Sequence, residues 1–90
     1  PPDTWTTVTG LFPGYGAGLA YVGGAENNVQ KSLFYFIRAG AGSSIVCQQL
    51  GTSGVEFGIN LRVTAGGNFE VYHTDSSNMD ISLSIVLLAL

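Results

Sequence analysis

The side chains that could carry out chemistry are few and scattered in this sequence. Cys47 is the single cysteine and His73 the single histidine. Nothing near Cys47 in sequence would lower its pKa, so we predict a small buried hydrophobic residue there. His73 falls on the apolar side of its strand. This position favours a histidine at the core edge with a hydrogen-bond partner, or else a ligand contact or a metal site shared between subunits.

The sequence predicts no catalytic constellation. His73 followed by Asp75 is too generic to indicate a catalytic triad. Glu56 and Glu70 share a predicted outer face, where exposed carboxylates lack the desolvation that raises the pKa of a catalytic acid. The stretch GYGAG at 14–18 lacks the Lys-Ser/Thr ending of a phosphate-binding loop, and no helix follows it. We therefore expect a non-enzymatic protein with no metal ion or other cofactor.

Aromatic residues provide the candidate recognition chemistry. Tyr15, Tyr21 and Tyr72 lie in predicted loops or on a polar strand face, and Arg62 is predicted to lie beside Tyr72. Rings stack on ligands while neighbouring amides and carboxylates form hydrogen bonds, which suits a sugar or a protein surface. We predict these four residues as receptor contacts. Trp5 is open to a second interpretation, in which it caps the core edge or a subunit contact.

The composition indicates a chain that associates with copies of itself. Only 10% of its 90 residues are charged, against roughly 25% in typical soluble domains. A single cysteine permits no intrachain disulfide, so oligomerisation is the remaining way to stabilise so small a core. The net charge of −3 argues against nucleic acid as a partner. The apolar stretch 81–90 is too short to cross a bilayer, so we expect no membrane insertion.

The spacing of apolar residues and glycines predicts an all-β chain. Thirteen glycines separate short segments rich in Thr, Ser, Val and Ile. About seven short strands at turn spacings of roughly 8–12 residues indicate one small antiparallel β-sandwich or jelly-roll-like domain over residues 1–90. Residues 31–39 are apolar on both sides, which predicts a strand covered on both faces, with a short buried helix as the alternative. The predicted strands are 5–9, 19–23, 31–39, 44–50, 55–65, 69–74 and 81–90.

A hairpin over residues 55–74 is the clearest local prediction. Apolar residues alternate with polar ones along the first strand, so one face is expected in the core. A three-residue loop at 66–68 keeps the apolar residues of both strands on one face. This register pairs Ala65 with Phe69 and Val63 with Val71, and it places Arg62 beside Tyr72.

The last strand predicts a subunit interface. Ile81, Leu83, Ile85 and Leu87 occupy one side, and we expect Leu83, Ile85 and Leu87 to fill the core. The other side begins with Ser82 and Ser84 and then becomes apolar. We predict that Val86, Leu88 and Leu90 line an interface between copies of the chain, because a solvated second face would be polar.

The opening DTWTTVTGLFPGYG at 3–16 resembles the start of trimeric tip domains at the ends of bacteriophage tail fibres. The glycine-rich β body and the apolar last strand are similar in style to the same tips and to knob folds of the C1q and tumour-necrosis-factor type. The resemblance implies a homotrimer in the virion that binds a glycan or protein of the host surface. With Pro1-Pro2 at its start, the chain is expected to be the C-terminal tip of a longer protein. A purely structural trimerisation domain or a capsid decoration subunit is the alternative.

Overall fold

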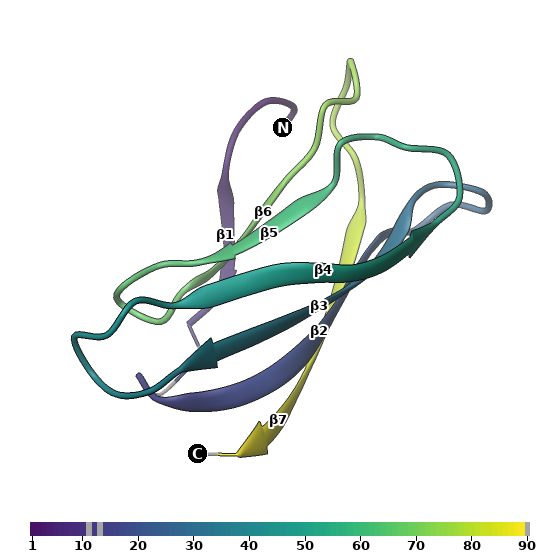
Figure 1. Ribbon diagram of the computed structural model, residues 1–90. Helices are drawn as coiled ribbons and strands as arrows, with labels where there is room; N and C mark the ends of the chain where they lie inside the picture. Colours follow the sequence, from purple (N-terminus) through teal and green to yellow (C-terminus); the bar gives the residue numbers. More distant parts are fainter. Residues whose placement is uncertain (11, 13, 90) are drawn as a thin grey trace.

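The computed structural model describes residues 1–10, 12 and 14–89, with only the backbone of Ala89 (Figure 1). Within these residues the chain is an all-β sandwich, as predicted, and no helix is long and apolar enough to span a membrane. The strands are β1 (Thr6–Thr9), β2 (Gly16–Gly24), β3 (Lys31–Arg38), β4 (Val46–Ser53), β5 (Asn60–Val63), β6 (Phe69–Tyr72) and β7 (Ile81–Ala89).

The strands form two antiparallel sheets that face each other. One sheet has three strands in the order β1-β6-β5, and the other has four in the order β4-β3-β2-β7. β5 lies beside β4 on one side of the sandwich, so the edge strands β1 and β7 share the opposite side (Figure 1). The sandwich therefore has two outer faces, and the side between β1 and β7 is open.

The core lies between the sheets and is built on aromatic rings. Phe36 of β3 contacts Phe69 of β6 edge-on, with ring centroids 5.0 Å apart. Phe12, from the segment between β1 and β2, lies 5.2 Å from Phe36 and closes one end of the core. The remaining buried apolar side chains are Ala20, Val22, Phe34, Ile59, Leu61 and Val71.

Gln30 is a buried side chain that joins the two sheets. Its side-chain oxygen accepts hydrogen bonds from the backbone N–H groups of Phe57 at 3.0 Å and Ile59 at 3.1 Å. Its amide nitrogen donates to the carbonyl of Ile59 at 3.2 Å and to the hydroxyl of Ser32 at 2.9 Å. The side chain thus takes the place of a paired strand for the segment that enters β5.

The predicted strand 55–65 is wrong at both ends, because β5 covers only Asn60–Val63. Val55 forms an isolated parallel bridge with Val29, and Phe57 and Ile59 bond to Gln30 and Thr74 rather than to a strand. Gly58 has a φ of 63°, a left-handed conformation that interrupts an extended backbone. Glu56 therefore does not share a strand face with Glu70, and the two carboxylates do not form a pair of the kind that glycosidases use.

The hairpin has the predicted loop length, but its register differs by two residues. Val63 pairs with Phe69, and Arg62 pairs with Glu70 rather than lying opposite Tyr72. The three loop residues are 65–67 instead of 66–68. Gly67 occupies the third position with a φ of 86°, which glycine adopts without strain, so this register puts the glycine where the left-handed residue is needed. A shift by two keeps each side chain on its predicted face.

The predicted strand 19–23 is too short at its start, because β2 already begins at Gly16. Gly18 is buried, and a Cβ built there would lie 2.6 Å from the carbonyl oxygen of Val86 on β7. Glycine is required at this position because the neighbouring strand and the Phe36 ring approach closely. β4 likewise continues through the predicted turn to Ser53, with an irregular register that leaves Leu50 exposed.

Candidate functional site

Charged and aromatic side chains form a cluster on the outer face of the three-stranded sheet. The rings of Trp5 and Tyr72 have centroids 5.2 Å apart. The Arg62 guanidinium lies 4.3 Å from the centroid of the Trp5 ring, within the range of a cation–π contact. Arg62 also forms an ion pair with Glu70, with an N–O distance of 2.6 Å. We call Asp3, Trp5, Arg62, Glu70 and Tyr72 the aromatic cluster.

Hydrogen bonds connect the aromatic cluster to the chain before β1. The Tyr72 hydroxyl donates to Asp3 at 3.2 Å, and this bond, followed by desolvation and the nearby negative charge, raises the pKa of the Tyr72 phenol. Thr7 donates to Glu70 at 3.2 Å. The cluster therefore presents rings, carboxylates and a guanidinium together, the groups with which proteins stack on and hydrogen-bond to sugars and to polar protein surfaces.

The structure brings together two of the four predicted receptor contacts. Tyr72 and Arg62 belong to the aromatic cluster, although their proximity arises through Trp5 and not through the predicted strand pairing. Tyr15 is 50% exposed in the segment between β1 and β2, away from the cluster. Tyr21 lies on the outer face of the other sheet, opposite Leu33 of β3. The four residues therefore do not form a single site.

The outer face of the four-stranded sheet is largely apolar, and its outward-facing polar residues include Gln48, Ser82 and Ser84. The pairings of the strands place Leu33 and Ile37 on this face, and both are exposed. The side chain of Lys31 also leaves β3 on this face, but its ammonium group donates hydrogen bonds to the carbonyls of Gly24 and Glu26 at the end of the sheet. We call the outward-facing side chains of Leu19, Tyr21, Leu33, Tyr35, Ile37, Val46 and Val86 the apolar sheet face.

β7 places the predicted interface residues at the margin of the apolar sheet face. Val86 is 58% exposed and Leu88 is 63% exposed, while Leu90 lies outside the described residues. Leu83 and Ile85 pack against the core, as predicted. The prediction that Leu87 fills the core is wrong. A bulge opposite Ala17 and Gly18 interrupts the strand pairing there, and Leu87 is exposed at the sheet edge.

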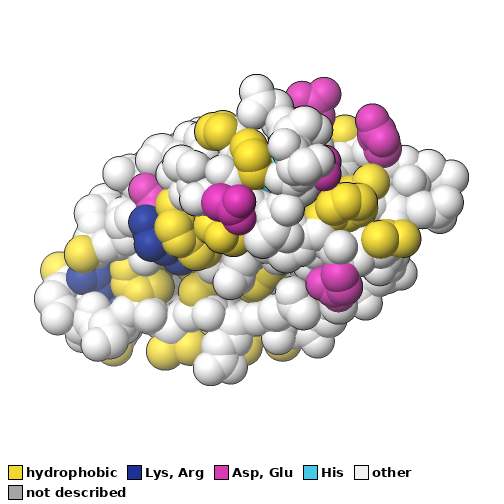
Figure 2. Space-filling model, turned by 90° about the horizontal axis from the view of Figure 1, so that it is seen from above, with side chains coloured by type: hydrophobic (Ala, Val, Ile, Leu, Met, Phe, Trp, Pro, Cys, Tyr) yellow, Lys and Arg dark blue, Asp and Glu magenta, His cyan; other side chains and the backbone are white. Residues whose placement is uncertain are grey.

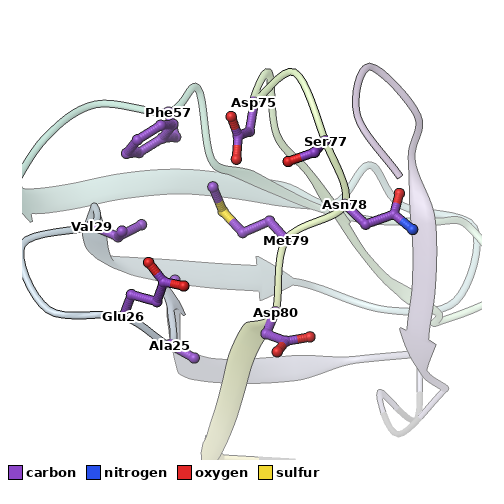
Figure 3. A pocket seen from close by; sticks show the side chains of 10 residues that line it. Ala25, Glu26, Val29, Phe57, Asp75, Ser77, Asn78, Met79 and Asp80 are labelled. Atoms are coloured by element: carbon purple, nitrogen blue, oxygen red, sulfur yellow. The ribbon is translucent and has the colours of Figure 1, made fainter.

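A cavity of about 370 Å³ at one end of the sandwich carries several carboxylates (Figure 3). Its apolar side chains are Val29, Phe57 and Met79. Glu26, Asp75 and Asp80 from two loops surround them (Figure 3). We call this cavity the acidic pocket. Figure 2 shows acidic side chains at the end of the molecule away from the visible basic side chains, with other acidic side chains near the centre and beside the basic ones.

Neither Cys47 nor His73 lies in an arrangement suited to catalysis. Cys47 is half-buried against the core, and desolvation raises the pKa of its thiol to about 11, which keeps the thiol protonated at neutral pH. His73 is buried, as predicted for a core-edge histidine. Among residues 1–10, 12 and 14–89, no three His, Cys, Asp or Glu side chains are grouped closely enough to hold a metal ion.

Sequence reasoning missed the acidic pocket and the contact between Arg62 and Trp5. The pocket and the contact each bring together residues that lie far apart in the sequence. The only signal for the pocket in the sequence was the presence of carboxylates in several predicted loops. Comparisons of the chain with protein-family models, with curated proteins and with solved structures found no match.

Proposed function

We propose that this chain is a non-enzymatic recognition domain that works as a homo-oligomer, with the apolar sheet face buried between copies. In the form expected from the resemblance at residues 3–16, three copies assemble at the tip of a viral fibre and bind a glycan or protein of a host surface. The observation that carries the proposal is the exposure of the uncharged apolar sheet face.

The size of the apolar sheet face fits an interface between proteins. Four strands about 4.8 Å apart, each rising about 3.3 Å per residue over eight residues, cover roughly 500 Å² in projection. A standard interface removes about 800 Å² of accessible surface per partner, and side chains enlarge the accessible surface beyond the projected area. Most of this surface is apolar, and the largest exposed apolar patch of a protein is often a functional binding surface.

The absence of charge on this face favours a second copy as the partner. A surface without charged groups has no electrostatic means of selecting a different protein, whereas an apolar face is complementary to itself. The polar aromatic cluster lies on the outer face of the opposite sheet. Assembly through the apolar sheet face therefore leaves the cluster free to contact a receptor.

The oligomeric state tests the assembly part of the proposal. Light scattering at about 10–100 µM is expected to give the mass of a homo-oligomer, because interfaces of standard size are usually formed at such concentrations. In the fibre-tip form the mass is that of three copies. A stable monomer throughout this range would contradict the proposal.

The Tyr72→Ala variant tests the recognition part. We expect it to reduce binding to whole bacterial cells and to arrays of bacterial surface glycans by at least about tenfold, since aromatic contacts are a frequent source of binding energy. The matched variant Tyr15→Ala removes the exposed predicted contact outside the cluster: a loss confined to Tyr72→Ala assigns the receptor site to the cluster, and a loss in both adds the segment between β1 and β2. Both variants should keep the mass of the assembly.

A purely structural domain is the second candidate, and one observation favours it. Arg62 already covers part of the Trp5 ring, and the Tyr72 hydroxyl already donates to Asp3. The polar and aromatic groups of the cluster therefore already have partners within the chain. Unchanged binding by Tyr72→Ala, with the assembly intact, would support the structural role over recognition.

A further inference from the structure

The side of the sandwich between β1 and β7 is open. A cavity of about 190 Å³ lies there between the two sheets, and its lining is mostly apolar. We call it the edge groove. Its lining includes Thr6, Val8, Val71, His73, Met79 and Ile81.

His73, which lines the edge groove, holds a buried hydrogen-bond donor without a partner among the described residues. The imidazole is only 3% exposed, and its Nδ1 atom accepts a hydrogen bond from the backbone N–H of Asp75 at 3.1 Å. Nδ1 therefore holds the lone pair, and Nε2 carries the proton of the neutral ring. Nε2 is buried and finds no acceptor among the described residues. Buried donors are almost always paired, so this one points to an acceptor brought by a binding partner.

The same tautomer argues against a metal at His73. A metal ion binds a ring nitrogen through its lone pair, but Nδ1 already uses its lone pair to accept from Asp75 and Nε2 is protonated. The group that completes this site is a hydrogen-bond acceptor, such as a carbonyl or hydroxyl oxygen.

The strands beside the edge groove are suited to binding an extended peptide. Among the residues that the structure describes, β1 pairs only with β6 and β7 only with β2, so each has one unpaired backbone edge. Ile81, Leu83 and Ile85 of β7 face the core but are only half-buried, because no strand lies beyond them. A peptide strand added to such an edge gains backbone hydrogen bonds and places alternate side chains in the groove.

The edge groove borders the acidic pocket at Met79. Met79 lines both cavities, and Asp80 of the acidic pocket is followed directly by Ile81 of the groove. A segment that lies in the groove and passes Met79 would therefore reach the carboxylates of Glu26, Asp75 and Asp80. Charge complementarity favours Lys or Arg at that end of the segment.

A second copy of this chain is a poor source of that basic residue. All three basic side chains of the chain are engaged internally. Lys31 donates to carbonyls beside the acidic pocket, buried Arg38 donates to Ser43 and Ala65, and Arg62 pairs with Glu70. The complementary charge must come from a different polypeptide.

We propose that the edge groove binds an extended segment of a different polypeptide, with apolar side chains at alternate positions and a Lys or Arg that reaches the acidic pocket. The segment pairs with a free strand edge and supplies an acceptor to Nε2 of His73. This site is separate from the apolar sheet face and goes beyond the proposed function.

A synthetic peptide tests the proposal. The probe is acetylated and amidated Lys-Val-Thr-Val-Thr-Val-Lys, with lysine at both ends so that either strand direction is served. Titration into the ¹⁵N-labelled protein is expected to shift amide resonances of β1, β7 and the 75–80 loop. The same peptide with glutamate in place of lysine should bind at least tenfold more weakly. No shifts in β1 and β7 at millimolar peptide, or equal binding of the two peptides, would overturn the proposal.

Two variants locate the peptide in the edge groove. Val8 is 48% exposed, so Val8→Asp is compatible with folding and introduces a charge into the groove. We expect it to weaken binding of the lysine peptide at least tenfold. His73→Phe removes the donor while keeping a ring, and a similar loss is expected. Undiminished binding by either folded variant would contradict the assignment. Val86→Asp, on the outer face of β7, should bind the peptide normally, which separates this site from the assembly.

Discussion

Replacement of Gln30 by methionine is expected to lower the free energy of unfolding by about 3–6 kcal/mol. Methionine has a similar length and is apolar, but it leaves the N–H groups of Phe57 and Ile59 and the carbonyl of Ile59 without the partners that Gln30 provides. Each of the two buried groups of Ile59 that loses its partner costs about 1–3 kcal/mol, and the partly buried N–H of Phe57 costs less, so the total is about 3–6 kcal/mol. Thermal and urea unfolding followed by circular dichroism, at one fixed protein concentration, measure this loss.

Gln49→Met is the matched control for this prediction. Gln49 is an exposed residue of β4, and a surface substitution of this kind usually changes stability by less than about 0.5 kcal/mol. Gln30→Glu refines the test, because a carboxylate can accept from Phe57 and Ile59 but cannot donate to the Ile59 carbonyl. It should also destabilise the protein. A Gln30→Met protein as stable as the Gln49→Met protein would refute the role of Gln30 in joining the sheets.

Replacement of Val86 by aspartate is expected to dissociate the assembly while the fold remains intact. Val86 is 58% exposed in the single chain, so the protomer tolerates a carboxylate there. In the assembly the same carboxylate would be buried against apolar side chains without a partner, which is strongly unfavourable. We expect the dissociation constant to rise at least about 100-fold, equivalent to about 2.7 kcal/mol. Sedimentation velocity over a dilution series measures the change.

Val8→Asp is the matched control for Val86→Asp. It makes the same substitution at a valine of similar exposure on the other sheet, and the assembly should keep its mass. If Val86→Asp assembles as the unmodified chain does, the apolar sheet face is not the interface. If both variants dissociate, the contact includes the open side between β1 and β7.

Local patterns in the sequence predicted the elements and the faces of their side chains. Alternation placed Leu61 and Val71 in the core and Arg62 and Glu70 outside it, as the structure has them. The stretch 31–39 is a strand and not the alternative helix, although its outer face is uncovered in the chain. Asn28 has a φ of 65°, a left-handed conformation that asparagine tolerates in turns.

Partners that lie far apart in sequence could not be predicted in the same way. The sequence around Gln30 does not show that its side chain is buried, because its hydrogen-bond partners are in the distant segment 55–59. The loop containing Phe12 looks flexible, yet that ring closes the core. Trp5 and Arg62 come together only because β1 adds to the sheet beside β6. Each of these contacts depends on how the strands are ordered, which no local pattern encodes.

By itself the sequence determined that this chain is a small all-β sandwich with too few charges to cover its surface, because strand alternation and composition are local properties. Only the tertiary structure decided where the uncovered apolar surface lies and which polar groups meet. Strand order places Leu33, Ile37 and Val86 on one outer face, and it opens a groove between β1 and β7 in which the buried donor of His73 lacks an acceptor. These features arise because each sheet buries one face in the core, whereas its other face and its edge strands remain available to bind partners.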